Sequence, residues 1–164
     1  MELIKSLKKV ETGMEGEIYF ALFERDIELV FDEDVSIEYV TKCVQKLNSL
    51  SEEAISAICN YSLDFCVDTM KNLPDVEYAK GLSDIKSNSD ILQFIQPISL
   101  TVDAPDDENI SAINLYCKCE WDEDNDMQIL LQNDTVLYVG VFDGLDPWQH
   151  NLSEWGNYVT GYRL

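Results

Sequence analysis

One short segment near the C-terminal end brings together the residue types that acid–base or metal chemistry requires. Asp143, Asp146 and His150, the only histidine of the chain, lie within eight residues of one another. Two carboxylates and one imidazole are too few ligands for a complete metal site, and no sequence feature supplies a cleft around them. A glycine and a proline in the same segment favour a structural turn. A binding surface that includes Trp148 and a small catalytic or cation-binding site are the alternatives.

A second acidic group resembles the first half of a calcium-binding loop. Asp122, Asp124 and Asp126 alternate, as the first ligands of an EF-hand do. Met127 stands where the EF-hand glycine belongs, and Asn133 stands where the bidentate glutamate belongs. The flanking segments also have strand periodicity rather than helix periodicity. This pattern therefore predicts a charged hairpin turn.

The other arrangements that carry catalysis are missing from the sequence. A single histidine leaves only His150 to activate a serine or cysteine nucleophile, and no serine lies in a Gly-x-Ser-x-Gly elbow. The seven glycines are scattered and form no phosphate-binding loop. We therefore predict a protein that is not an enzyme and that needs no cofactor and no metal.

The five cysteines are odd in number and follow helix or strand spacing rather than a disulfide pattern. They are Cys43, Cys59, Cys66, Cys117 and Cys119. Cysteine prefers protein interiors, so the sequence predicts buried, reduced thiols in a cytoplasmic protein.

The formal net charge of −21 restricts the partners. Each third of the chain carries about the same excess of acids, so the folded body bears the charge and not a tail. Such a field repels nucleic acid and anionic membranes and attracts basic proteins. Residues 119–162 contain nine acids and no Lys or Arg, which points to the C-terminal half as the face that meets a basic partner.

The length fits one acidic domain over residues 1–164, with enough apolar residues for a core. No apolar run is long enough to cross a bilayer, and residues 1–10 form an amphipathic mix that is not a secretory signal. A cytoplasmic location without membrane contact is the expectation.

Helical periodicity predicts two helices in the first half of the chain. The first follows Ser36, a candidate N-cap, and carries apolar residues at helical spacing: Val40, Cys43, Val44 and Leu47. The second begins at Ser51 and ends before Pro74, with two acids in its first turn, where the helix dipole favours them. Residues 91–95 are compatible with a short helix or with the start of a strand.

Strand periodicity dominates the two ends of the chain. Residues 18–23 and 27–31 predict a hairpin that turns at Arg25-Asp26, and residues 98–102 alternate before a solvated loop at residues 103–109. Residues 111–121 predict a strand with one buried side, and residues 127–132 and 135–142 continue the meander through an Asn133-Asp134 turn. The predicted fold is α+β: an antiparallel sheet, made of an N-terminal hairpin plus a C-terminal meander, packed against two or three helices.

The C-terminal half resembles a group of acidic bacterial domains whose function is uncharacterised. The likeness rests on the run from Cys119 to Asp124, the following two strands with their polar turn, and the Asp-Gly-Leu-Asp-Pro-Trp run at residues 143–148. It covers about residues 112–155. The sequence departs from the group's Trp-Asp-x-Glu-His-Gly pattern at Asn125 and Asp126. The resemblance implies a small cytosolic α/β protein without catalytic residues, and some members of the group resemble toxin-immunity proteins.

Charge and resemblance together lead to a functional hypothesis. The sequence predicts a cytosolic immunity protein or inhibitor that masks a basic toxin, such as a nuclease, through an acidic surface. The residues expected to bind are Glu120, Asp122, Glu123, Asp124, Asp126, Asp143, Asp146 and Trp148. The alternative is a small metal-dependent enzyme or cation-binding protein centred on Asp143, Asp146 and His150.

Overall fold

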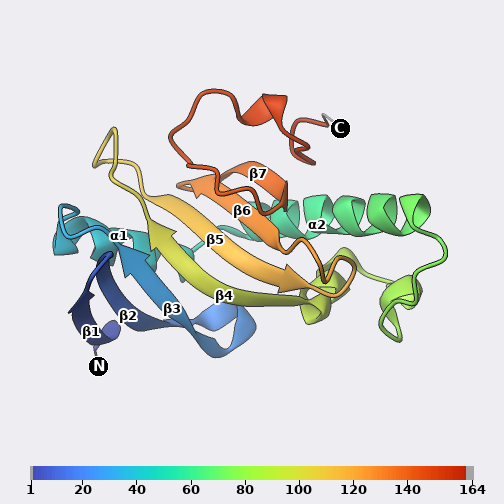
Figure 1. Ribbon diagram of the computed structural model, residues 1–164, viewed down its shortest axis with the longest axis horizontal. Coiled ribbons are helices and arrows are strands. Elements are labelled where there is room, and N and C mark those ends of the chain that lie inside the picture. The colour runs from blue at the N-terminus through green and yellow to red at the C-terminus, as the bar shows by residue number, and fades with distance from the viewer. Residues whose placement is uncertain (1, 162–164) are drawn as a thin grey trace.

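The protein forms a seven-stranded β-sheet with two α-helices against one face (Figure 1). The computed structural model describes residues 2–161. The strands lie in the sheet in chain order: β1 (Ile4–Val10), β2 (Gly13–Phe20), β3 (Arg25–Phe31), β4 (Ile95–Val102), β5 (Ala112–Cys119), β6 (Met127–Gln132) and β7 (Thr135–Val141). The helices α1 (Ile37–Leu47) and α2 (Glu52–Asn72) both lie between β3 and β4 in the chain. The predicted α+β class is confirmed.

The N-terminal strands and the C-terminal meander join through one parallel strand pair. β3 pairs with β4 in parallel, and every other neighbouring pair is antiparallel. Parallel neighbours need a long crossover, because the chain must return to the end of the sheet from which it started. Helices α1 and α2 supply this crossover. Leu29 then lies opposite Leu100, and Phe31 opposite Val102, with all four side chains buried.

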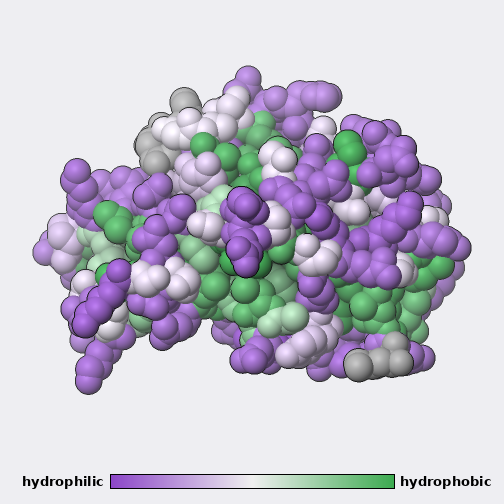
Figure 2. All heavy atoms as spheres, turned by 180° about the vertical axis from the view of Figure 1, so that it is seen from behind, coloured by the Kyte–Doolittle hydropathy of each residue, from purple (hydrophilic) through white to green (hydrophobic). Residues whose placement is uncertain are grey.

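The main core lies between the sheet and the two helices. Alternate residues of β5 face it, and the apolar positions predicted for the first helix are all buried in it. Figure 2 views the molecule from behind, the side on which the helices lie: hydrophilic residues cover much of this surface, and hydrophobic residues show between them. The five cysteines are buried and unpaired by disulfides, as expected of reduced thiols.

The helix boundaries agree with the capping signals in the sequence. The Ser36 hydroxyl accepts a hydrogen bond from the Tyr39 N–H at 3.2 Å, and the Ser51 hydroxyl accepts one from the Ala54 N–H at 3.1 Å. Each bond satisfies a backbone donor that the first helical turn leaves without a partner. α2 ends at Asn72, two residues before Pro74, which could not continue the helix.

The predicted turn of the first hairpin is wrong by several residues. Arg25 and Asp26 lie inside β3, and a 3-10 helix over Ala21–Phe23 makes the connection. Asn48, at the end of α1, holds this connection: its side chain accepts from the Ala21 N–H at 2.8 Å and donates to the Tyr19 carbonyl at 2.7 Å. The position of the turn therefore depends on a residue distant in the chain, which local periodicity cannot reveal.

The edge strand β1 was not predicted. Its side chains include Lys5, Lys8 and Lys9, which give the segment its mixed pattern. Lys5 lies 2.9 Å from the Asp26 carboxylate and 3.6 Å from that of Glu17, so ion pairs with β2 and β3 accompany the backbone pairing. Lysines on an edge strand also disfavour pairing with another molecule.

The segment that precedes β4 combines the two alternatives that the sequence left open. A 3-10 helix spans Asn88–Phe94, and β4 begins directly after it at Ile95. A capping box between Ser87 and Asp90 starts the helix. Its buried residue Ile91 belongs to the main core.

Residues 142–161, here called the C-terminal segment, begin on the sheet face opposite the helices. Leu145 and Leu152 pack there against Leu130 and Tyr138 and form a second, smaller core. The segment lies beside β7, the last strand of the sheet (Figure 1), and these contacts cover part of β6 and β7 on this face. The even side of β5 is consequently also partly buried, so the prediction that only one side is buried was too simple.

The same segment then closes the outer edge of β7. The Tyr158 N–H donates to the Val139 carbonyl at 2.9 Å, and the Asn157 side chain donates to the Leu137 carbonyl at 2.9 Å. The Tyr158 ring stacks on Phe65 of α2 with ring centroids 4.9 Å apart. The segment therefore connects both faces of the sheet and removes an exposed edge.

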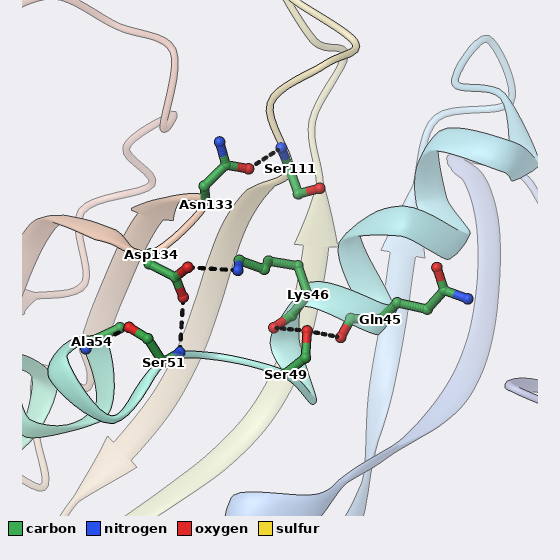
Figure 3. Close-up of polar contacts among 8 residues, drawn as sticks. All are labelled: Gln45, Lys46, Ser49, Ser51, Ala54, Ser111, Asn133 and Asp134. Carbon is green, nitrogen blue, oxygen red and sulfur yellow. Dashed lines mark hydrogen bonds and ion pairs between the residues drawn. The ribbon is translucent and has the colours of Figure 1, made fainter.

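Asp134, in the predicted Asn133-Asp134 turn, joins this turn to the helices (Figure 3). Its carboxylate accepts from the Ser51 N–H at 2.8 Å and lies 2.7 Å from the Lys46 ammonium. Asn133 has a φ of 52°, a conformation that asparagine tolerates, and its side chain accepts from the Ser111 N–H at 2.9 Å. The turn is confirmed, and it also fixes the start of α2.

Replacing Asp134 with Ala should lower the free energy of unfolding by about 1 kcal/mol at pH 7, since two charge-assisted hydrogen bonds are lost from a partly exposed site. Lys46 and the Ser51 N–H hold the pKa of this carboxyl below its ordinary value. Its contribution is therefore present at neutral pH and is lost as the pH falls through the lowered pKa. Urea denaturation at pH 7 and about pH 3 measures both effects. Asp134→Asn, which keeps an acceptor for Ser51, should lose less; equal stability of all three proteins would contradict the prediction.

Within residues 2–161, no helix is both long and apolar enough to span a membrane.

Candidate functional site

The turn between β5 and β6 carries most of the residues predicted to bind. Glu120, Glu123 and Asp124 are exposed, whereas Asp122 and Asp126 are half-buried. The Asp122 carboxylate accepts two hydrogen bonds from the Asn125 side chain, at 3.1 and 3.3 Å, which close the turn. The segment with the calcium-like alternation therefore forms the predicted charged hairpin turn. The carboxylates of Glu120, Glu123 and Asp124 face solvent in it.

Asp126 has a structural role in the same turn. It has a φ of 48°, its side chain accepts from the Tyr116 hydroxyl, and Lys118 lies 3.9 Å from its other oxygen. Its carbonyl accepts from the Phe142 N–H at 3.2 Å and so connects the turn to the C-terminal segment. Of the predicted binding residues, Asp126 is thus partly occupied by contacts within the chain.

A second segment brings further charge to this turn. A hollow of about 140 Å³ is lined by the β5–β6 turn and by four residues that follow α2, Leu73, Val76, Glu77 and Tyr78. The hollow contains Leu73, Val76 and Tyr78 beside five carboxylates, and its residues include no Lys or Arg. We call these carboxylates the acidic end; they are Glu77, Glu120, Asp122, Glu123 and Asp124. Glu77 was missed in the sequence because its proximity depends on the packing of α2.

The other side of the same turn has mixed charge. A hollow of about 510 Å³ there includes Arg25 and Lys118 beside Glu120, Glu123 and Asp126. Two of the few basic residues therefore lie close to the turn, in a hollow that Glu77 does not line. The acidic end is consequently the more strongly negative of the two surfaces.

The structure separates the residues of the Asp143–His150 loop. Asp143 and His150 are exposed, whereas Asp146 is half-buried and its side chain accepts from the Trp148 N–H at 2.7 Å. Trp148 is half-buried as well. This loop contributes Asp146, but not Asp143 or His150, to a hollow on the open face of the sheet. Among residues 2–161, no three His, Cys, Asp or Glu side chains are placed to share a metal ion.

Two buried amides attach the loop to the sheet. The Gln128 side chain donates to the Leu145 carbonyl at 2.9 Å and to the Asn114 side chain at 2.8 Å, and its oxygen accepts from the Leu145 N–H at 3.1 Å. Asn114 also donates to the Leu145 carbonyl, at 3.3 Å. Because Gln128 is fully buried and bonded at both ends of its amide, the backbone at Leu145 has a defined position.

The hollow beside this network, here called the polar hollow, has a volume of about 370 Å³. It lies between the C-terminal segment and the strands β4, β5 and β6, and is lined by Ser99, Thr101, Asp103, Asn114, Tyr116, Gln128, Phe142, Gly144, Leu145 and Asp146. Asp103 is half-buried and accepts from the Asn114 side chain at 3.0 Å. Burial raises the pKa of its carboxyl to about 6, and the Asp146 and Asp32 carboxylates add to this rise.

Asp103 begins the loop predicted at residues 103–109, as expected, but it is half-buried rather than solvated. The alternation of residues in β4 indicates the position of Asp103. Leu100 and Val102 face the helices, so Ser99, Thr101 and the following Asp103 lie on the opposite face of the sheet. The alternation could therefore have assigned Asp103 to the sheet face. That the C-terminal segment would partly cover it is a feature of the tertiary structure.

The thiols offer no activated nucleophile. Burial raises the pKa of all five cysteines, to about 11 for Cys66 and about 12 for Cys119. A thiol reacts through its thiolate, which burial suppresses.

A known family model matches most of the chain. The model of a domain of unknown function, DUF6985, matches residues 3–147, which include the whole sheet, both helices and the acidic end. The chain belongs to the DUF6985 family. The family match ends at Pro147, inside the C-terminal segment and before Trp148 and His150. The expected membership in a family of unknown function is therefore confirmed. No curated protein and no solved structure matches the chain.

Proposed function

We propose that this DUF6985 protein is a non-catalytic binding protein of the bacterial cytosol whose acidic end binds a basic protein. In its most specific form, the proposal is an immunity protein that masks a basic toxin such as a nuclease. The observation that carries it is the acidic end itself, with five carboxylates around one hollow and no basic residue among those that line it.

The surface has the composition of a protein interface. Leu73 and Val76, which line the same hollow as the acidic end, are each 50% exposed. Apolar anchors surrounded by polar groups that exclude water are typical of the residues that dominate binding energy. The surrounding carboxylates would accelerate encounter with a cationic partner, and a nuclease must be cationic where it holds phosphates.

Neutralising the acidic end should abolish capture of the basic partner. Glu120→Gln, Glu123→Gln and Asp124→Asn together remove three exposed charges without altering the bonds of Asp122. The matched control removes three charges from the loop after β4, at Asp106, Asp107 and Glu108, which are also exposed. Affinity capture from the source lysate, followed by mass spectrometry, should recover the same basic protein with the wild type and the control and not with the acidic-end variant.

Kinetics with the purified partner then test the mechanism. The association rate should fall more than about tenfold as salt rises from about 0.05 to 0.5 M, because screening removes the steering. The dissociation rate should rise with Leu73→Ser, since the apolar anchor acts after encounter. Equal capture by the acidic-end variant, or a partner that is not basic, would overturn the proposal.

A further inference from the structure

We propose that the polar hollow is a binding site for an organic cation, namely a primary ammonium or guanidinium group on a short alkyl chain. This site goes beyond the proposed function, because its residues and those that line the acidic end do not overlap.

The first argument is uncompensated charge. Asp103 and Asp146 both line the hollow, and Asp103 is half-buried. None of the ion pairs formed within residues 2–161 includes either carboxylate. A desolvated carboxylate without a counter-charge is unfavourable, and a bound cation would remove this penalty. Perturbed carboxylates in a concave site are a general mark of binding sites.

The second argument is the remaining lining, which suits an ammonium group with an alkyl chain. Ser99 and Thr101 precede Asp103 on the same face of β4 and offer hydroxyl oxygens that can accept from N–H donors. Tyr116, which lies opposite Ser99 in the sheet, forms an edge-to-face aromatic pair with Phe142, with ring centroids 4.9 Å apart. Aromatic rings attract cations and pack well against methylene groups.

The third argument is that one wall of the hollow is already ordered before a ligand binds. Leu145 and Gly144 form one side, and Gln128 and Asn114 hold the Leu145 backbone through hydrogen bonds of 2.9 to 3.3 Å. A site that is ordered before binding loses little conformational entropy when its ligand arrives.

A divalent metal fits this hollow less well than an organic cation. Calcium takes six to eight oxygen ligands, and within residues 2–161 no three His, Cys, Asp or Glu side chains are placed to share a metal ion. An ammonium group is satisfied by three acceptors, which one carboxylate and two hydroxyls can provide.

The test uses the full chain and cadaverine, a five-carbon diamine, as the probe in a titration followed by NMR. Saturable shifts should concentrate at residues 99–103, 114–116 and 142–146. Asp103→Asn and Asp146→Asn should each weaken binding by about tenfold or more, because each removes a charge-assisted contact. Asp106→Asn, an exposed neighbour in the same loop, should change it less than about twofold.

Comparison probes separate the explanations. N-acetyl-lysine methylamide represents a lysine of a protein: preferential binding of this probe indicates a protein side chain as the natural source, and preferential binding of cadaverine indicates a free amine. The acidic-end variant should bind cadaverine as the wild type does, so that failure of the proposed function leaves this result intact. The proposal is overturned if neutral pentanediol or calcium chloride produces the same shifts, if no saturable shift occurs, or if Asp106→Asn weakens binding as much as Asp103→Asn.

Discussion

Replacing Asp103 with Asn should make the protein more stable at pH 7, by on the order of 2 kcal/mol. Burial, with help from Asp146 and Asp32, raises the pKa of this carboxyl from 3.8 to about 6. Ionisation of Asp103 at pH 7 therefore costs free energy in the folded state that it does not cost in the unfolded chain. Asparagine removes this penalty, and its side-chain oxygen can still accept the hydrogen bond from Asn114.

The sign of the pH dependence follows from the same shift. Between about pH 4 and pH 6 the folded protein holds a proton on Asp103 that the unfolded chain has released, so the free energy of unfolding falls as the pH rises through this window. In Asp103→Asn this decline should be smaller. The groups that act on Asp103 come from three elements: Asn114 in β5, Asp146 in the C-terminal segment, and Asp32 after β3. All of them remain in the variant.

Urea denaturation of both proteins between pH 4.5 and about 7.5 measures the difference. Asp106→Asn is the matched control, because any lost carboxylate relieves some self-repulsion in a chain of net charge −21. Asp106→Asn should raise the free energy of unfolding by a small amount that changes little with pH. A variant at Asp103 that is no more stable than this control at pH 7, or that shows the slope of the wild type, would refute the interpretation of Asp103 as a desolvated carboxylate.

Replacing Gln128 with Leu should destabilise the protein by about 3 kcal/mol and release the start of the C-terminal segment. Leucine fills a similar volume but leaves the Leu145 N–H and the Asn114 side-chain oxygen without the partner that they have in the folded protein. Buried polar groups without partners are costly, because folding still removes them from water. The effect should therefore exceed that of losing a single surface hydrogen bond.

Gln132→Leu is the control for this variant. Gln132 lies in the same strand and donates one hydrogen bond, of 2.9 Å, to the Pro147 carbonyl of the same segment. It is only half-buried, so its replacement should reduce stability by about 1 kcal/mol. Hydrogen exchange should show faster exchange at Leu145 in Gln128→Leu than in Gln132→Leu. Unchanged protection of the Leu145 amide would show that Gln128 does not hold the segment.

The elements that could be predicted are those encoded by neighbouring residues. Ser36 and Ser51 cap the helices because a serine hydroxyl reaches a backbone N–H three residues ahead. The meander was predictable because alternate residues of β5 are apolar, because β6 and β7 are apolar runs, and because Asn133 between them tolerates a positive φ. The strand β1 and the turn at Ala21–Phe23 were not, because one depends on pairing with β2 and the other on Asn48.

The candidate sites divide in the same way. Glu120, Glu123 and Asp124 could be chosen from the sequence, because charges in a hairpin turn are exposed wherever the turn lies. Their grouping with Glu77 could not, since it depends on where α2 ends relative to β5. Asp143 and His150, which the sequence suggested as potential catalytic groups, are exposed. Asp146 instead lines one hollow together with Asp103, which lies 43 positions earlier in the chain.

By itself, the sequence of this DUF6985 protein determined its α+β class, both α-helices, the C-terminal meander and the strongly acidic character of its surface. These properties follow from short-range hydrogen bonding, from the periodicity of burial and from the sum of charges. The tertiary structure decided the parallel pairing of β3 with β4, the course of the C-terminal segment around β7, and the meeting of Asp103 with Asp146. Each of these three features depends on contacts between residues that are far apart in the chain. No local sequence pattern encodes such contacts, because their free energy depends on how the whole chain is arranged in space.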